Sequence, residues 1–205
     1  MFVDAFDQLM ASNLFEVVGL VSGLLCVWLL IKESIWTWPI GLIYTLVSLV
    51  VFFQAKLYSE FGLHIYYALM NAYGWYYWSR VGAEDSTIPV AQIKAKTAYI
   101  LIAISLVTVV ALAELMTRFT DADMAYPDSL ITTLSFVAMW MTARKLLESW
   151  YVWLLVDVIA TILYVTKGIE LYAVLYGVYI VMAVFGWLAW RSTLRSQQQT
   201  QKVLV

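Results

Sequence analysis

One segment of the sequence carries a single carboxylate among aromatic residues at helical spacing. Steps of three and four residues separate Trp150, Trp153, Asp157, Thr161 and Tyr164, so an α-helix would present all of them on one face. Aromatic rings beside a carboxylate suit a flat organic cation, which is held by cation–π contact and by charge pairing. The alternative is that Asp157 is protonated, or is paired with a neighbouring helix for structural reasons.

A second polar face is predicted in the segment 58–79. It carries the only histidine of the chain, His64, followed at helical spacing by Tyr67 and Asn71. A single histidine in an apolar segment is more often a packing residue than a ligand. The amide of Asn71, one step along the same face, favours a binding role, so both interpretations of His64 stay open.

Two further segments offer residues for the same site. Tyr44 lies beside a stripe of small and polar residues, which either lines a pathway or lets two helices pack closely: Gly41, Thr45 and Ser48. Tyr176 and Tyr179 lie in the last apolar segment. Tyrosines there either bind a ligand or anchor a helix at the membrane interface.

The composition identifies the solvent around these segments as lipid. Of the residues, 63% are hydrophobic and 13% are charged, and the mean hydropathy is +0.82, whereas a soluble domain is about a quarter charged. The apolar runs are long and continuous, which predicts helices, because a membrane-spanning chain must satisfy its backbone polar groups internally. The basic residues form no stripe, so no nucleic-acid partner is expected. The lone Cys26 cannot form an internal disulfide.

About twenty apolar residues are needed to cross a bilayer, and the sequence offers seven such segments. We expect helices near 14–31, 35–54, 58–79, 95–116, 129–145, 149–166 and 169–190, followed by a frayed, Gln-rich tail from Arg191. The start of the chain has no basic region typical of a cleaved signal peptide, so the first helix is expected to be retained.

The distribution of Lys and Arg predicts the orientation in the membrane. With the N-terminus outside, three basic residues fall outside: Lys56, Arg118 and Lys167. The other nine fall on the cytoplasmic side: Lys32, Arg80, Lys94, Lys96, Arg144, Lys145, Arg191, Arg195 and Lys202. Because cytoplasmic loops carry the excess of basic residues, the sequence predicts an outer N-terminus and a cytoplasmic C-terminus.

The chain also matches itself when the sequence is shifted along itself so that Trp38 falls on Trp150. We call this shift the repeat offset. The other pairs at this offset are Tyr67 with Tyr179, Gly74-Trp75 with Gly186-Trp187, and Trp78 with Trp190. Chance alignment of aromatic-rich helices is the alternative, but the matches keep their order. We predict one transmembrane domain of two parallel three-helix repeats, 14–79 and 129–190, joined by a linking helix at 95–116. In transporters of the SWEET type this 3+1+3 arrangement places the site near the midplane.

Two motifs resemble signatures of the PnuC-type vitamin transporters. They are Asn71-Ala-Tyr-Gly-Trp-Tyr-Tyr-Trp78 and Trp150-Tyr-Val-Trp153-Leu-Leu-Val-Asp157, and the likeness extends over nearly the whole chain. The resemblance implies an all-α fold like an enlarged SWEET, homotrimers in the bacterial cytoplasmic membrane, and facilitated diffusion of a vitamin that is trapped inside by phosphorylation. It implies no cofactor and no enzymatic activity of the chain itself.

The resemblance also bears on which vitamin is carried. Family members that carry nicotinamide riboside place amides at positions that match Tyr44, His64 and Asp157 here. These departures favour an aminopyrimidine cation, so thiamine is the expected cargo, with nicotinamide riboside as the alternative and riboflavin as a third choice. In this hypothesis Trp150 and Trp153 stack on the rings, while Asp157 pairs with the cation.

Three other classes of protein fit the sequence less well than a transporter. A retinal photoreceptor needs a lysine in the middle of its last helix, and 169–190 contains none. An intramembrane enzyme needs a nucleophile with its base or clustered metal ligands, and the single His, single Cys and central Asp lie on different predicted helices. A scaffold protein would not need a central carboxylate among tryptophans.

Overall fold

The computed structural model describes residues 13–54, 58–81, 88–119, 124–168 and 170–203. These residues form the seven predicted helices: α2 (Asn13–Ile31), α3 (Thr37–Gln54), α4 (Tyr58–Val81), α5 (Ala95–Phe119), α6 (Ala125–Ala143), α7 (Ser149–Thr166) and α8 (Glu170–Val203). By length and composition, three of the described helical segments are apolar enough to cross a membrane, in α5, α7 and α8.

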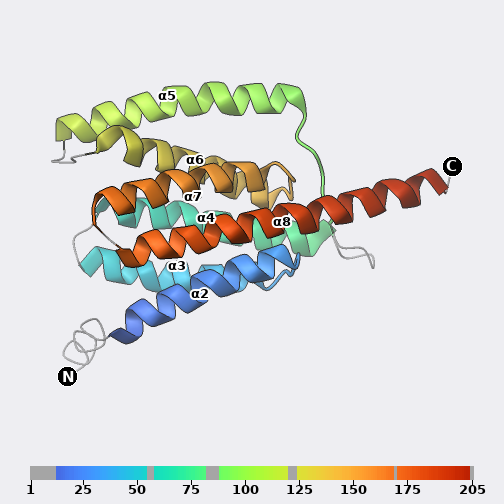
Figure 1. The fold of residues 1–205 in the computed structure, drawn as a ribbon, viewed down its shortest axis with the longest axis horizontal. Coiled ribbons are helices and arrows are strands. Elements are labelled where there is room, and N and C mark those ends of the chain that lie inside the picture. The colour runs from blue at the N-terminus through green and yellow to red at the C-terminus, as the bar shows by residue number, and fades with distance from the viewer. Residues whose placement is uncertain (1–12, 55–57, 82–87, 120–123, 169, 204–205) are drawn as a thin grey trace.

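The helices alternate in direction along the bundle (Figure 1). α2, α4, α6 and α8 run toward one end, while α3, α5 and α7 run back. We call the end where α8 leaves the bundle the C-terminal end. The turns after α2 and α6 lie at this end, together with the segment that leads into α5.

The predicted fraying of the tail is wrong, because α8 continues as a helix to Val203. Its 34 residues make it about 50 Å long, well beyond a bilayer core of about 30 Å. The segment after Arg191 contains no Gly or Pro and carries four Gln together with Leu194, Arg195 and Lys202, all of which are good helix formers. Hydropathy alone detects only the apolar part of such a helix. α6 likewise begins four residues before the predicted start, at Ala125.

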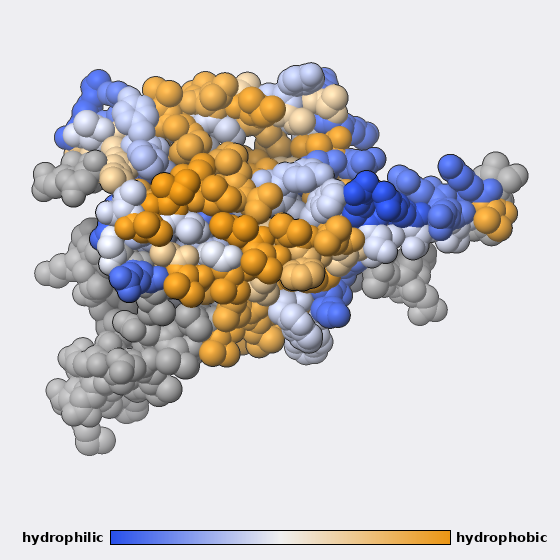
Figure 2. Space-filling view, in the orientation of Figure 1, coloured by the Kyte–Doolittle hydropathy of each residue, from blue (hydrophilic) through white to orange (hydrophobic). Residues whose placement is uncertain are grey.

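Six of the described helices pack in a closed ring. Neighbouring pairs in the ring are α2–α3, α3–α4, α4–α6, α6–α7, α7–α8 and α8–α2. We call α2–α4 the N-terminal triplet and α6–α8 the C-terminal triplet. α5 packs only on α6 among the described helices and leaves large apolar side chains such as Leu106 and Val107 exposed, as a lipid-facing helix would. Figure 2 shows the apolar surface over the bundle and the hydrophilic end of α8 beyond it.

Within each triplet, a tryptophan ring lies directly against a glycine of the neighbouring helix. A Cβ added to Gly74 would overlap the ring of Trp38, and one added to Gly186 would overlap the ring of Trp150. Glycine is therefore required at both positions by the close approach of a rigid ring. The two contacts are equivalent at the repeat offset.

The turns after α2 and α6 are also equivalent at this offset. Each ends in a Schellman arrangement of two backbone hydrogen bonds. The bonds run from Glu33 N–H to Leu30 and Ser34 N–H to Leu29 after α2, and from Lys145 N–H to Thr142 and Leu146 N–H to Met141 after α6. The left-handed position that glycine usually occupies in this motif is held by Glu33, with φ 56°, and by Lys145, with φ 55°.

Tryptophans from both triplets meet in the main core cluster, toward the C-terminal end. Trp78 lies 5.3 Å from Trp38 and 6.3 Å from Trp190 between ring centroids. Ile88 and Val90 of the segment before α5 are also buried in this cluster. The segment before α5 is therefore anchored in the core by these two side chains, although Pro89, Ala91 and Gln92 are exposed. Ala91 forms an isolated backbone bridge with Leu146.

Candidate functional site

The candidate site is centred on Asp157, the ninth residue of the 18-residue helix α7. Its side chain is buried, with 5% of the residue exposed. The carboxylate interacts electrostatically with the hydroxyls of Tyr176 and Tyr179, which come from α8. A buried carboxylate at this depth is costly, and the neighbouring phenol groups provide a polar, aromatic surrounding for it.

Tyrosine rings form the aromatic wall beside this carboxylate. Tyr176 stacks on Tyr164 of α7, with 5.3 Å between ring centroids and an angle of 29° between the rings. It meets Tyr179 edge-on at 5.8 Å, and Tyr172 lies 5.3 Å from Tyr164. The wall is therefore built by α7 and α8 together, and its members can offer both ring faces and hydroxyl groups to a ligand.

The N-terminal triplet contributes the opposite side of the site through α4. Tyr67 interacts electrostatically with Tyr176 across the two triplets. The ring of His64 meets Tyr67 edge-on at 5.7 Å, and the side chain of Asn71 donates to the Tyr67 carbonyl at 2.8 Å. His64 and Asn71 are both buried, at 8% and 6% exposed. The structure thus brings the predicted polar face of 58–79 up to the tyrosines of α8.

Helix α3 supplies two side chains to this region. Asn71 also donates to Thr45 Oγ1 at 3.4 Å and packs against Gly41. Tyr44 is 39% exposed and interacts electrostatically with Tyr179. The small-residue stripe of α3 therefore lets α4 approach closely, and it also places Thr45 beside the amide of Asn71.

The two predicted stacking tryptophans have packing partners. Trp150 is 2% exposed and lies against Gly186 and edge-on to Trp190 at 5.4 Å. Trp153 is partly buried and donates its indole N–H to Thr142 Oγ1 of α6 at 2.9 Å. Asp157, Tyr176 and Tyr179 thus come together with His64, Asn71 and Tyr44, whereas these two rings brace α7 against α8 and α6.

Sequence reasoning did not include Thr45 and Tyr164 among the site residues. Thr45 is equivalent to Asp157 at the repeat offset, so the repeat itself indicated that Thr45 belongs to the site. Tyr164 was on the predicted face of α7, but its contact with Tyr176 depends on how α7 and α8 pack. Thr161, on the same face, donates its hydroxyl to the carbonyl of Asp157 at 2.7 Å.

Within residues 13–54, 58–81, 88–119, 124–168 and 170–203, no group of three or more His, Cys, Asp or Glu residues could hold a metal ion. The site offers one carboxylate, one imidazole, amide and hydroxyl groups, and aromatic faces. Such a set can bind a flat polar molecule by hydrogen bonds, ring stacking and charge.

Comparisons with known proteins agree with a transport function. Residues 13–192 match the family described as nicotinamide mononucleotide transporter. The chain is 27% identical to the "Nicotinamide riboside transporter PnuC" of Escherichia coli, over 89% of this chain and 87% of that protein. It is 30% identical to the "Riboflavin/roseoflavin transporter RibM" of Streptomyces davaonensis, over 97% of this chain and 92% of that protein.

A solved structure shares the fold. The "Crystal structure of the Vitamin B3 transporter PnuC" superposes with a TM-score of 0.72 at 20% sequence identity, covering 95% of this chain and 88% of that chain. The ring of helices and the position of α5 therefore belong to a fold already seen in a membrane transporter.

Proposed function

The chain belongs to the nicotinamide mononucleotide transporter family of membrane vitamin transporters, and we propose that it imports nicotinamide riboside by facilitated diffusion. The observation that carries this proposal is the buried carboxylate of Asp157, which interacts electrostatically with Tyr176 and Tyr179. Tyr176 in turn interacts with Tyr67 of the other triplet. Nicotinamide riboside is a flat pyridinium cation, so both the charge and the aromatic wall suit it. The amide oxygen of Asn71 can accept a hydrogen bond from a carboxamide N–H.

Thiamine is the second candidate cargo. It is also a flat aromatic cation, and the departures at Tyr44, His64 and Asp157 from the amides of the nicotinamide riboside carriers favour it. The named relatives carry nicotinamide riboside or riboflavin, which is why thiamine, the cargo expected from the sequence, takes second place. Riboflavin has no cationic ring, and a buried carboxylate gives it no charge pairing.

We propose a 3+1+3 arrangement of parallel repeats, like an enlarged SWEET, with α5 as the linking helix. The closed ring of six helices and the equivalent turns after α2 and α6 support it. In this proposal the cargo binds at mid-depth between the triplets, which rock against each other to give alternating access.

We further propose that the C-terminal end of the bundle faces the cytoplasm of a bacterial cell. The excess of Lys and Arg at this end supports that orientation. Trapping of the imported vitamin by a cytoplasmic kinase and assembly as a homotrimer are proposed by resemblance to the family.

Calorimetry on the purified protein tests the cargo. Nicotinamide riboside is expected to bind more tightly than thiamine or riboflavin. The variant Asp157→Asn should bind nicotinamide riboside about 10- to 100-fold more weakly, a loss of about 1.4 to 2.8 kcal/mol, since the charge that pairs with the pyridinium ring is lost. Asp128→Asn is the matched control, because Asp128 forms a half-exposed ion pair with Lys167 at 3.7 Å.

Two results would change the proposal. Tighter binding of thiamine would make thiamine the cargo and leave the site in place. An unchanged affinity in Asp157→Asn, with the control also unchanged, would remove the carboxylate from the site.

A further inference from the structure

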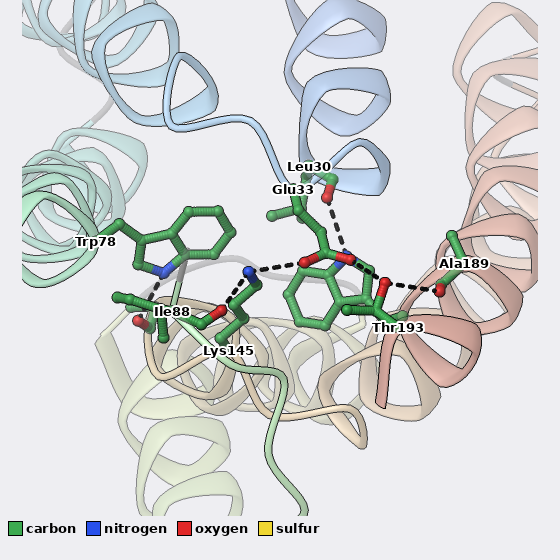
Figure 3. Close-up of polar contacts among 9 residues, drawn as sticks. Leu30, Glu33, Trp78, Ile88, Lys145, Ala189 and Thr193 are labelled. Carbon is green, nitrogen blue, oxygen red and sulfur yellow. Dashed lines mark hydrogen bonds and ion pairs between the residues drawn. The ribbon is translucent and has the colours of Figure 1, made fainter. Parts of the chain in front are cut away.

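A buried ion pair joins the two triplets at the C-terminal end of the bundle (Figure 3). Lys145 Nζ lies 2.8 Å from Glu33 Oε2, and the two side chains are only 1% and 16% exposed. Glu33 follows α2 and Lys145 follows α6, so each charge comes from a different triplet. Neither residue belongs to the candidate site.

Each charge is held by further contacts. Lys145 Nζ donates to the carbonyl of Ile88 at 2.6 Å and lies over the ring of Trp78, 4.9 Å from its centroid. Glu33 Oε1 accepts a hydrogen bond from Thr193 Oγ1 of α8 at 2.6 Å. Lys145 therefore reaches into the N-terminal triplet through Trp78, and Glu33 reaches into the C-terminal triplet through Thr193.

The backbone at both positions favours glycine, yet both carry long charged side chains. Glu33 and Lys145 occupy the left-handed position of their Schellman turns, where a side chain is strained. A glycine would end each helix at lower cost. The two side chains also have opposite charge at positions that are equivalent at the repeat offset, so they can meet across the axis that relates the triplets.

Two further hydrogen bonds cross the same interface beside the pair. The indole of Trp78 in α4 donates to the carbonyl of Ala143 in α6 at 3.1 Å. The indole of Trp190 in α8 donates to the carbonyl of Leu30 in α2 at 3.1 Å. The C-terminal end is thus closed by polar contacts between triplets, and these must part if a ligand is to leave between the triplets at this end.

Resting on the proposed transport function and orientation, we propose that Glu33 and Lys145 form the latch of a cytoplasmic gate. The pair is made when the exit is closed and is broken when the triplets separate to release the vitamin. Water reaches both charges in the open state and hydrates them, whereas removal of one partner in the closed state leaves the other buried and uncompensated. Loss of one charge should therefore favour the open state.

Access to a buried thiol measures the gate without any vitamin. In a Cys26→Ser background, Ala143→Cys places a reporter at a residue that is 0% exposed and belongs to the cluster containing Trp78 and Trp190. Inside-out membrane vesicles are treated with a membrane-impermeant thiol reagent. We expect Glu33→Gln to raise the labelling rate at least about tenfold, the size expected when a buried pair is broken and the populations shift.

Lys32→Gln is the matched control, because Lys32 is an exposed charge in the same turn and its loss should change labelling by less than about twofold. If the Ala143→Cys protein does not fold, Ser149→Cys, which is isosteric and 1% exposed, replaces it. Equal labelling in Glu33→Gln and in its parent would overturn the latch, even if thermal stability falls. Faster labelling in right-side-out vesicles, with no change in inside-out vesicles, would overturn the cytoplasmic position.

The outcome for the latch is separate from the outcome for the cargo. The reagent reports on opening whether or not nicotinamide riboside binds. Normal vitamin binding with unchanged labelling in Glu33→Gln would overturn the latch proposal and leave the proposed function standing. Faster labelling in Glu33→Gln of a protein that binds no vitamin would support the latch and overturn the proposed function.

Discussion

Trp38 packs on Gly74 in the N-terminal triplet, and Trp150 packs on Gly186 in the C-terminal triplet. The same ring-on-glycine contact thus recurs in both halves of the molecule, and so does the backbone geometry of the turns after α2 and α6. These shared contacts build the scaffold, and none of them includes a residue of the aromatic wall around Asp157.

The triplets differ at the positions that face the site. The repeat offset pairs Thr45 with Asp157, His64 with Tyr176, and Asn71 with Ala183. At these positions the N-terminal triplet therefore offers a hydroxyl, an imidazole and an amide, and the C-terminal triplet offers a carboxylate and a phenol. A symmetric scaffold with an asymmetric site would hold a cargo in one orientation, with its cationic ring toward the C-terminal triplet.

The largest expected effect tests the shared scaffold. Gly74→Ala and Gly186→Ala should each lower the free energy of unfolding by about 2 kcal/mol, because the new methyl group overlaps a buried tryptophan ring. Thermal unfolding of the purified protein measures the loss. A large loss at only one of the two glycines would show that the halves are not equivalent in packing.

Matched controls for this test lie on the same helices. Gly62 in α4 and Gly177 in α8 have no neighbouring atom within 4 Å of an added Cβ. Gly62→Ala and Gly177→Ala should be neutral or stabilising by up to about 1 kcal/mol, because alanine is the better helix former. Destabilisation by these controls would mean that the loss at Gly74 and Gly186 is not specific to the rings.

The next effect tests the asymmetry of the site. Asp157→Thr should weaken binding of nicotinamide riboside about tenfold or more, about 1.4 kcal/mol. Adding Thr45→Asp, which moves the carboxylate to the equivalent position of the other triplet, should not restore the affinity. Calorimetry on the single and double variants measures this. Full recovery in the double variant would show that the two sides are interchangeable.

The sequence predicts the scaffold better than the site. Apolar runs fix the helix count, and four tryptophans of the self-match pack in the core, namely Trp38, Trp78, Trp150 and Trp190, whereas Trp75 is exposed. The face of α7 was predicted from spacing alone, and spacing does not say which neighbour covers each residue. Trp150 and Asp157 share that face, yet Trp150 packs against Gly186 and Trp190, while Asp157 interacts electrostatically with Tyr176 and Tyr179.

The ion pair shows a second limit of sequence reasoning. Glu33 and Lys145 lie far apart in the chain. Taken alone, each is simply a charged residue that follows an apolar segment. Their pairing depends on two helix ends that meet in space and on a left-handed backbone at both. The one feature of the sequence that could have indicated this ion pair is that the two positions are equivalent at the repeat offset and carry opposite charges.

The smallest expected effect tests the crossed indole contacts that tie the triplets together. Trp78→Phe and Trp190→Phe keep an aromatic ring but remove the N–H that donates to Ala143 or Leu30. Each loss should cost about 1 kcal/mol in thermal unfolding, the typical net worth of a hydrogen bond. The Leu30 carbonyl keeps the N–H of Glu33 as a donor, so the loss at Trp190 should be the smaller of the two. Equal losses would mean that ring volume, which both substitutions reduce alike, outweighs the hydrogen bonds.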